Sequence, residues 1–206
     1  MPESDALLLQ QAAAGHAAAF PALLRRHGQA IHAYLARRGG REAADDLLSE
    51  VFLRAYAARR QYDERWHDAR PWLYGIARNV LREHWRRAGA RRAGARRAGG
   101  ELSDLAAIED PWPDVDASLD AAAQLPRLRS ALAQLGAGDR AVLLLVTWEG
   151  LTPAEAAVAL RIPPGTARSR LHRARSVMRQ LLDTDTDTNT YTGTDIARPA
   201  ASRQEA

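Results

Sequence analysis

The chain has neither cysteine nor lysine among its 206 residues. Without cysteine it cannot form disulfides, thiolate zinc sites or a cysteine nucleophile. Without lysine it lacks the side chain that a Walker-type phosphate loop requires and the amine that Schiff-base catalysis requires. All 29 basic residues are therefore arginines, and 25 acidic residues reduce the net charge to +4.

Long hydrophobic runs are also missing from the sequence. The longest strongly apolar run is AVLLLV at 141–146, far shorter than a membrane-spanning helix. The N-terminus carries Glu3 and Asp5 where a secretory signal would carry basic residues. We therefore expect a cytoplasmic protein without membrane insertion. Because 46% of the residues are hydrophobic, the chain can fold around a core.

The apolar residues recur at helical spacing, and no strand-like alternation of useful length is visible, so we expect an all-α fold. Leu23, His27, Ile31 and Tyr34 are three or four positions apart, as on one face of a helix. After a break at 39–42, the sequence predicts a second helix over 43–60 and a third that begins near Pro71. Proline is favourable in the first turn of a helix.

Two segments of opposite charge follow. The five-residue repeat RRAGARRAGARRAG at 86–99 carries six arginines, and we interpret it as a basic helix end that frays into a linker. The next segment, 101–120, carries seven acidic residues and no arginine, a composition that repels nucleic acid. We expect two small helical domains, 1–88 and 125–183, joined by a basic and acidic flexible linker over 89–124 and followed by a disordered tail over 184–206.

The second domain has the pattern of a helix-turn-helix. Thr152 is placed to cap a helix, with Pro153 in the first turn and Glu155 at the third position. The segment RIPPG at 161–165 ends that helix, and the next one begins at Gly165 or Thr166. Two short helices joined by a tight turn are typical of this DNA-binding motif.

The helix after the turn is rich in arginine. Residues 161–180 include six arginines and no acidic residue. At helical spacing an apolar stripe that includes Leu171 and Met178 lies opposite Ser169 and Arg173. Such a face suits the major groove, where arginine bonds guanine through two atoms. The arginines could instead only solvate an exposed face, but the preceding turn favours DNA binding.

A second basic zone is interleaved with aromatic residues. Five aromatic residues lie between Tyr62 and Trp85, a combination that suits unstacked or single-stranded nucleic acid. Trp72 and Tyr74 could instead belong to the core, which we favour for Trp72. The roles of Trp66 and Trp85 stay open at this point.

An acidic group formed by Asp45, Asp46 and Glu50 completes the candidate sites. A catalytic carboxylate pair would need a partner, and none is evident nearby. The group is therefore either a solvated face or a docking surface for a basic partner. The six histidines show no metal-binding spacing. We expect no enzymatic activity, no metal and no cofactor.

Three segments together resemble the extracytoplasmic-function (ECF) sigma factors, a compact class of sigma-70-like transcription initiation subunits. DDLLSEVFLRAY at 45–56 resembles the helix that docks on the clamp helices of the polymerase β′ subunit. PWLYGIARNVLREHWRR at 71–87 resembles the segment that opens and reads the −10 promoter element. LTPAEAAVALRIPPGTARSRLHRARSVM at 151–178 is similar to the fourth region, which reads the −35 element. The resemblance implies binding to core RNA polymerase (its β′ and β subunits), to promoter DNA and to an anti-sigma factor.

The resemblance and the residue patterns together define three candidate surfaces. The polymerase-binding surface comprises Asp45, Asp46, Leu47, Glu50, Val51 and Phe52. The −10 surface comprises Tyr62, Trp66, Arg78, Asn79, Arg82, Trp85 and Arg86, and the resemblance implies that Asn79 captures a flipped base. The −35 surface comprises Thr166, Arg168, Ser169, Arg170, His172, Arg173 and Arg175.

Two other functions compete with this interpretation. A stand-alone helix-turn-helix regulator would act without forming a polymerase holoenzyme, and it would leave the Asp46 and Glu50 surface unexplained. A nucleic-acid-processing enzyme would need a metal or nucleophile constellation that the sequence does not supply.

Overall fold

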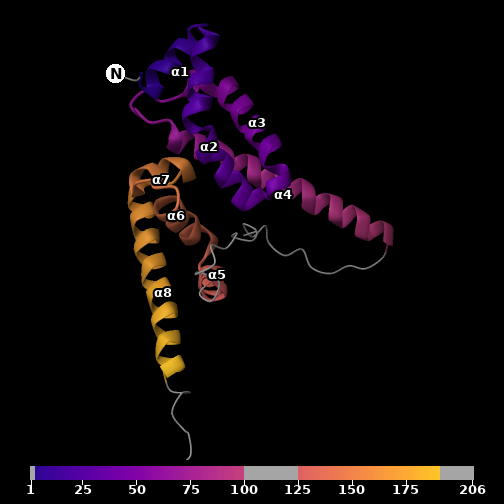
Figure 1. Cartoon of the computed structure of the whole chain (residues 1–206), viewed down its shortest axis with the longest axis vertical. Coiled ribbons are helices and arrows are strands. Elements are labelled where there is room, and N and C mark those ends of the chain that lie inside the picture. Colours follow the sequence, from indigo (N-terminus) through magenta and orange to yellow (C-terminus); the bar gives the residue numbers. More distant parts are fainter. Residues whose placement is uncertain (1–2, 100–124, 191–206) are drawn as a thin grey trace, which may run out of the picture.

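The computed structural model describes residues 3–99 and 125–190, and within these ranges every regular element is a helix (Figure 1). The all-α expectation is confirmed. None of the helices in the described ranges is long and apolar enough to cross a membrane. The first domain contains α1 (Asp5–Ala13), η1 (Ala17–Ala19), α2 (Phe20–Gly39), α3 (Arg41–Ala58), η2 (Arg59–Gln61) and α4 (Arg70–Gly99).

Helices α2, α3 and α4 pack around the core of the first domain. The stripe predicted for α2 is confirmed, because Leu23, His27, Ile31 and Tyr34 are all buried. Gly40 ends α2 with a φ of 87°, a backbone conformation that favours glycine. The chain can therefore turn sharply there and start α3 one residue later.

The second domain contains α5 (Leu125–Gln134), α6 (Ala137–Thr147), α7 (Pro153–Leu160) and α8 (Pro164–Thr190). The predicted cap of α7 is confirmed. The Thr152 hydroxyl accepts from the Glu155 N–H, and the Glu155 carboxylate accepts from the Thr152 N–H. Arg161 ends α7 in the left-handed region with a φ of 53°, which directs the chain into α8. Helices α7 and α8 thus form the predicted helix-turn-helix.

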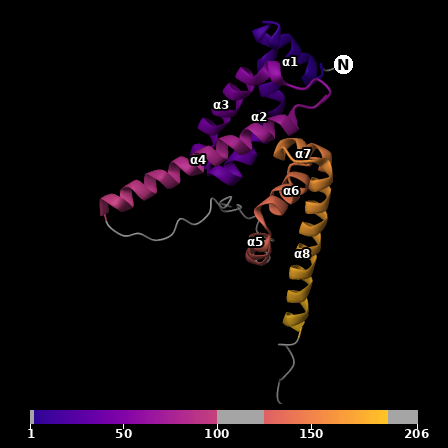
Figure 2. The ribbon, with the colours of Figure 1, turned by 180° about the vertical axis from the view of Figure 1, so that it is seen from behind.

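The two domains pack directly on each other through α4 and α7, which Figures 1 and 2 show side by side from opposite directions. An ideal Cβ on Gly75 of α4 would lie 3.1 Å from the carbonyl oxygen of Ala159 in α7. Ala156 and Ala159 are buried in the same apolar cluster as Leu73 of the first domain. Small residues on both helices therefore allow this close approach.

Two helices are longer than the sequence predicted. α4 continues to Gly99, so the basic repeat is helical across the boundary we expected after residue 88. α8 continues to Thr190, so it extends into the segment from residue 184 that we expected to be a disordered tail. The acidic segment at 101–120 and the rest of the tail, 191–206, lie outside the described residues.

Candidate nucleic-acid and polymerase interfaces

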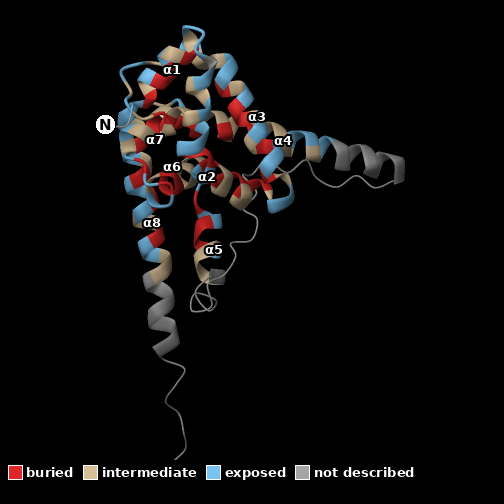
Figure 3. Ribbon diagram, turned by 45° about the horizontal axis from the view of Figure 1, so that its top comes forward, coloured by how far each residue is buried: buried red, intermediate tan, exposed pale blue. Residues whose placement is uncertain are grey.

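Helix α8 separates a buried stripe from an exposed polar face, as predicted. Ala167, Leu171, Ala174 and Met178 are buried, the last three in one cluster with residues of α5 and α6. Figure 3 shows buried and exposed residues alternating along the helix. The predicted −35 residues lie on the remaining surface. Arg168, Ser169, His172, Arg173 and Arg175 are exposed, and Thr166 and Arg170 are partly buried.

One residue of this face is held by a neighbouring helix. The carboxylate of Asp139 in α6 accepts from Arg173 Nε at 2.5 Å and from Arg173 Nη2 at 2.8 Å. The Arg173 side chain is still 60% exposed. The hydrogen bonds from Arg173 lower the pKa of Asp139, so its carboxylate stays charged at neutral pH.

The preceding residue of α6 lies against a second arginine of the same face. An ideal Cβ on Gly138 would lie 2.6 Å from Arg170 Nη1. The bare glycine therefore leaves room for the Arg170 guanidinium. The first turn of α6 contacts two of the predicted DNA-reading arginines, a relationship that the sequence did not reveal.

The predicted polymerase surface on α3 divides into two faces. Asp45 and Asp46 are exposed, as a docking surface requires. Leu47, Val51 and Phe52 are instead buried in the core of the first domain, which does not fit the direct contact expected for them. Leu47 and Val51 are four positions apart, so they share the face of α3 that packs on the core.

Sequence reasoning missed an exposed leucine on the acidic face of α3. Leu53 is 67% exposed and lies seven positions after Asp46, so both share one face. Glu50, on the same face, accepts from Arg54 Nε at 2.6 Å. Arg54 also bonds both carboxylate oxygens of Glu83 in α4, which ties α3 to α4. The face therefore combines negative charge with one large apolar side chain.

The predicted −10 surface lies on α4 and the loop that precedes it. Arg82 and Arg86 are exposed, and Arg78 and Asn79 are partly buried. Trp85 donates its indole N–H to the carbonyl oxygen of Arg38 at 3.1 Å, which anchors its ring to α2.

The loop before α4 is organised around a buried tyrosine. Tyr62 is only 8% exposed, donates its hydroxyl to the carbonyl oxygen of Trp66 at 2.5 Å, and packs edge-on against Trp72. The direct DNA contact expected for Tyr62 does not fit this burial. Trp66 and Trp72 are both partly buried against the core, so Trp72 lies at the edge of the core of the first domain.

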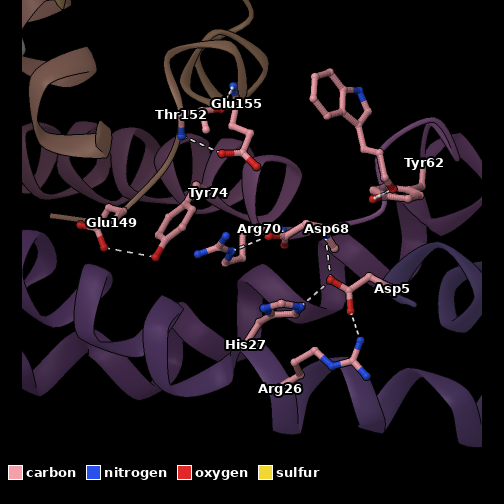
Figure 4. A network of polar contacts seen from close by, with 12 residues as sticks. Asp5, Arg26, His27, Tyr62, Asp68, Arg70, Tyr74, Glu149, Thr152 and Glu155 are labelled. Carbon is pink, nitrogen blue, oxygen red and sulfur yellow. Dashed lines mark hydrogen bonds and ion pairs between the residues drawn. The ribbon is translucent and has the colours of Figure 1, made fainter. Parts of the chain in front are cut away.

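A buried carboxylate joins α1 to the start of α4 (Figure 4). Asp5 Oδ2 accepts from His27 Nε2 at 2.7 Å and from the Ala69 N–H at 2.8 Å, and Asp5 Oδ1 pairs with Arg26. Burial opposes the charge on Asp5, but these hydrogen bonds outweigh it and hold its pKa below the usual value.

The same cluster is a geometric candidate for a metal site. Ligand atoms of Asp5, His27 and Asp68 lie within 4.8 Å of one another. Both oxygens of Asp5 already accept hydrogen bonds, and Asp68 accepts from the N–H and Nε of Arg70. A cation would also lie next to the Arg26 guanidinium. The donor set therefore suits a structural hydrogen-bond network.

A second buried carboxylate joins the two domains (Figure 4). Glu149, between α6 and α7, is 7% exposed. Its oxygens accept from Arg37 Nη2 at 2.9 Å, from Arg38 Nη1 at 3.2 Å and from the Tyr74 hydroxyl at 3.2 Å. Burial and the neighbouring Glu149 carboxylate raise the pKa of Tyr74, so its hydroxyl stays protonated and can donate.

Comparisons with known proteins agree with this arrangement. The Sigma-70 region 2 family matches residues 23–91, and the Sigma-70, region 4 family matches residues 125–178. RNA polymerase sigma factor CnrH of Cupriavidus metallidurans is 33% identical over 90% of this chain and 97% of that protein. ECF RNA polymerase sigma factor SigL of Mycobacterium tuberculosis is 34% identical over 83% of this chain and 93% of that protein.

Solved structures support the same fold. CnrH in complex with the cytosolic domain of CnrY matches with a TM-score of 0.59 and 28% identity, over 88% of this chain and 98% of that chain. RpoE in complex with the anti-sigma factor NepR, from Bartonella quintana, matches with a TM-score of 0.54 and 24% identity, over 81% of this chain and 98% of that chain. The chain therefore belongs to the ECF sigma factors of the sigma-70 family, which direct core RNA polymerase to promoters.

Proposed function

We propose that this sigma factor divides its work among three surfaces. The acidic face of α3 docks on core polymerase, α4 engages the −10 element, and the exposed face of α8 reads the −35 element. The observation that carries the proposal is the two-sided character of α8. A buried apolar stripe fixes α8 in its domain. Ser169 and Arg173 lie on the exposed face of the helix, where base edges can reach them.

On α3, the contact is made by Asp45, Asp46, Glu50 and Leu53. Charged groups steer a basic partner, and a large exposed apolar side chain supplies the area that is buried on binding. Leu47, Val51 and Phe52 support this surface from inside, because they fix α3 on the core of the first domain.

On α4, Arg82 and Arg86 contact the phosphate backbone, because both are exposed and always charged. Asn79 receives a base that has left the stack, with Arg78 beside it. Unstacking costs a few kcal/mol, which contacts of the base with Asn79 and binding to the polymerase offset. Tyr62 acts indirectly, since its hydroxyl bond to Trp66 holds the loop in place.

The proposed mechanism is one of binding, without catalysis by this chain and without a cofactor. We place the protein in the cytoplasm, where a bacterial sigma factor meets polymerase and chromosome. We further propose that an anti-sigma factor regulates it. The structure of CnrH, a relative, with the cytosolic domain of CnrY supports a protein partner of this kind.

Holoenzyme formation tests the polymerase surface. Leu53→Arg places a cation on the acidic face of α3, whereas Leu24→Arg changes a leucine of α2 that is 41% exposed. We expect Leu53→Arg to weaken co-elution with core polymerase at least tenfold, as loss of a central interface contact does. Leu24→Arg should bind like the wild type. Equal binding by both variants would refute the assignment of this face.

A further inference from the structure

We infer that Asp139 is a positioning residue that sets the base preference of Arg173. The inference rests on the proposed function, in which α8 reads the −35 element. Asp139 lies on α6, outside the helix-turn-helix, and faces the DNA-reading helix from a neighbouring element.

The geometry leaves one edge of the guanidinium free. Asp139 takes the edge formed by Nε and Nη2 of Arg173, with contacts of 2.5 and 2.8 Å. A guanidinium has five N–H donors, so the second N–H of Nη2 and both N–H groups of Nη1 stay available. That second edge is the one that can bond O6 and N7 of a guanine together. One edge is therefore fixed by protein while the other is presented.

Asp139 is itself held firmly. It is the third residue of α6, where the amide groups at the helix N-terminus favour a negative charge. Its side chain is only 14% exposed, and α6 packs against α8 along the second core. The carboxylate thus has a defined place relative to the helix that it supports.

Fixing Arg173 before it meets DNA reduces the entropy lost on binding. A free arginine side chain gives up much rotamer freedom when it is immobilised, and preorganisation removes part of that cost. It also limits the base pairs that the guanidinium can reach. The consequence of the contact should therefore appear in selectivity more than in total affinity.

Two other roles of Asp139 can be separated from positioning by experiment. If Asp139 withheld Arg173 from DNA, its removal would sharpen the preference of the protein. If Asp139 only stabilised the domain, its removal would weaken binding to all promoters alike. Positioning instead predicts a loss of selectivity at one position of the −35 element, so neither alternative gives the same result.

The test uses holoenzyme assembled from core polymerase and the full chain, on promoters with each base pair of the −35 element randomised in turn. Asp139→Asn and Asp139→Ala are compared with the wild type and Arg173→Ala, with the conservative Asp139→Glu and with the double variant Arg173→Ala/Asp139→Asn. Selectivity is the ratio of transcripts between the best and the worst base at each position. Binding of the same holoenzymes to promoter-free DNA and thermal melting are measured in parallel.

We expect Arg173→Ala to lower selectivity at one position by about 5- to 100-fold, the range of one bidentate base contact. Asp139→Asn and Asp139→Ala should lower it at the same position by roughly three- to tenfold, as a part of that contact. Asp139→Glu should lose less selectivity than Asp139→Asn. In the Arg173→Ala background, Asp139→Asn should cause no further change in selectivity. Binding to promoter-free DNA should stay equal or rise, because a negative charge is removed.

Unchanged or increased selectivity in Asp139→Asn would overturn the inference, as would a uniform loss at all promoters. In those cases the response of Arg173→Ala shows whether the reading role of α8 stands. If Arg173→Ala itself leaves selectivity unchanged, the proposed −35 surface fails, and the role of Asp139 fails with it.

Discussion

Arg37 and Glu149 lie 112 positions apart in the chain, yet Arg37 Nη2 is 2.9 Å from both oxygens of the Glu149 carboxylate. Arg38 and Tyr74, which also belong to the first domain, donate hydrogen bonds to the same carboxylate. Only 3% of the Glu149 side chain is exposed, and that of Arg38 only 4%. This cluster and the close approach of Gly75 to Ala159 hold the domains together.

Glu149→Ala should separate the two domains. The substitution leaves the Arg38 guanidinium buried without its carboxylate, which costs about 3–5 kcal/mol when one partner of a buried pair is removed. Opening the contact returns Arg38 to water, so we expect a larger radius of gyration in small-angle X-ray scattering. Arg37→Ala is the milder control, because the Arg37 side chain is 33% exposed. An unchanged radius for Glu149→Ala would show that apolar packing alone maintains the contact.

Promoter binding should also open the contact between α4 and α7. The −10 and −35 elements are about 25 base pairs apart, which is roughly 85 Å of duplex at about 3.4 Å per base pair. Domains joined through Gly75 and Ala159 cannot span that separation. Fluorophores on Leu24 and Gln180, replaced by cysteine in this cysteine-free chain, should show lower energy transfer in the promoter complex. Equal transfer with and without promoter DNA would contradict simultaneous reading of both elements.

The buried carboxylate of Asp5 should make the first domain sensitive to acid. Its pKa lies below the usual value in the folded protein, so it contributes stability above the unfolded pKa of about 3.9 and loses it as pH falls through the folded pKa. At pH 7, Asp5→Asn should be less stable than the wild type by about 1–3 kcal/mol and should therefore melt at a lower temperature. Its stability should fall less than that of the wild type as the pH is lowered.

The exposed Asp45 provides the matched control for Asp5. Its side chain is 92% exposed, so Asp45→Asn should melt like the wild type from pH 7 to pH 3. Parallel melting curves for Asp5→Asn and the wild type over this range would contradict a stabilising role for the Asp5 carboxylate.

Local signals in the sequence predicted the elements well where cause and effect lie within a few residues. The cap of α7 depends on Thr152 and Glu155, three positions apart, and the buried stripe of α8 follows from helical spacing. The mixed fate of the α3 motif also follows from spacing, because DDLLSEVF wraps around the helix. The resemblance assigned Leu47 and Val51 as contacts although helical spacing places both on the apolar stripe, and it did not single out the exposed Leu53.

The relationships that complete the sites depend on tertiary packing. Asp5 meets Ala69, 64 positions away, and Arg173 meets Asp139, 34 positions away. Neither pair has a local signature, since an acidic residue near a helix start is common on any surface. The length of α8 was misjudged because an apolar face was taken as the condition for a helix, although backbone hydrogen bonds can continue one already nucleated.

Transcription with purified components tests the central claim most directly. Three samples would transcribe the same genomic DNA: core polymerase alone, core polymerase with the wild-type chain, and core polymerase with the Arg173→Ala variant. All transcript starts would be mapped. We predict starts that require the chain and share two upstream elements, with the −35 element relaxed at one position in Arg173→Ala. Starts that do not depend on the chain, or an identical −35 element in both, would contradict the account.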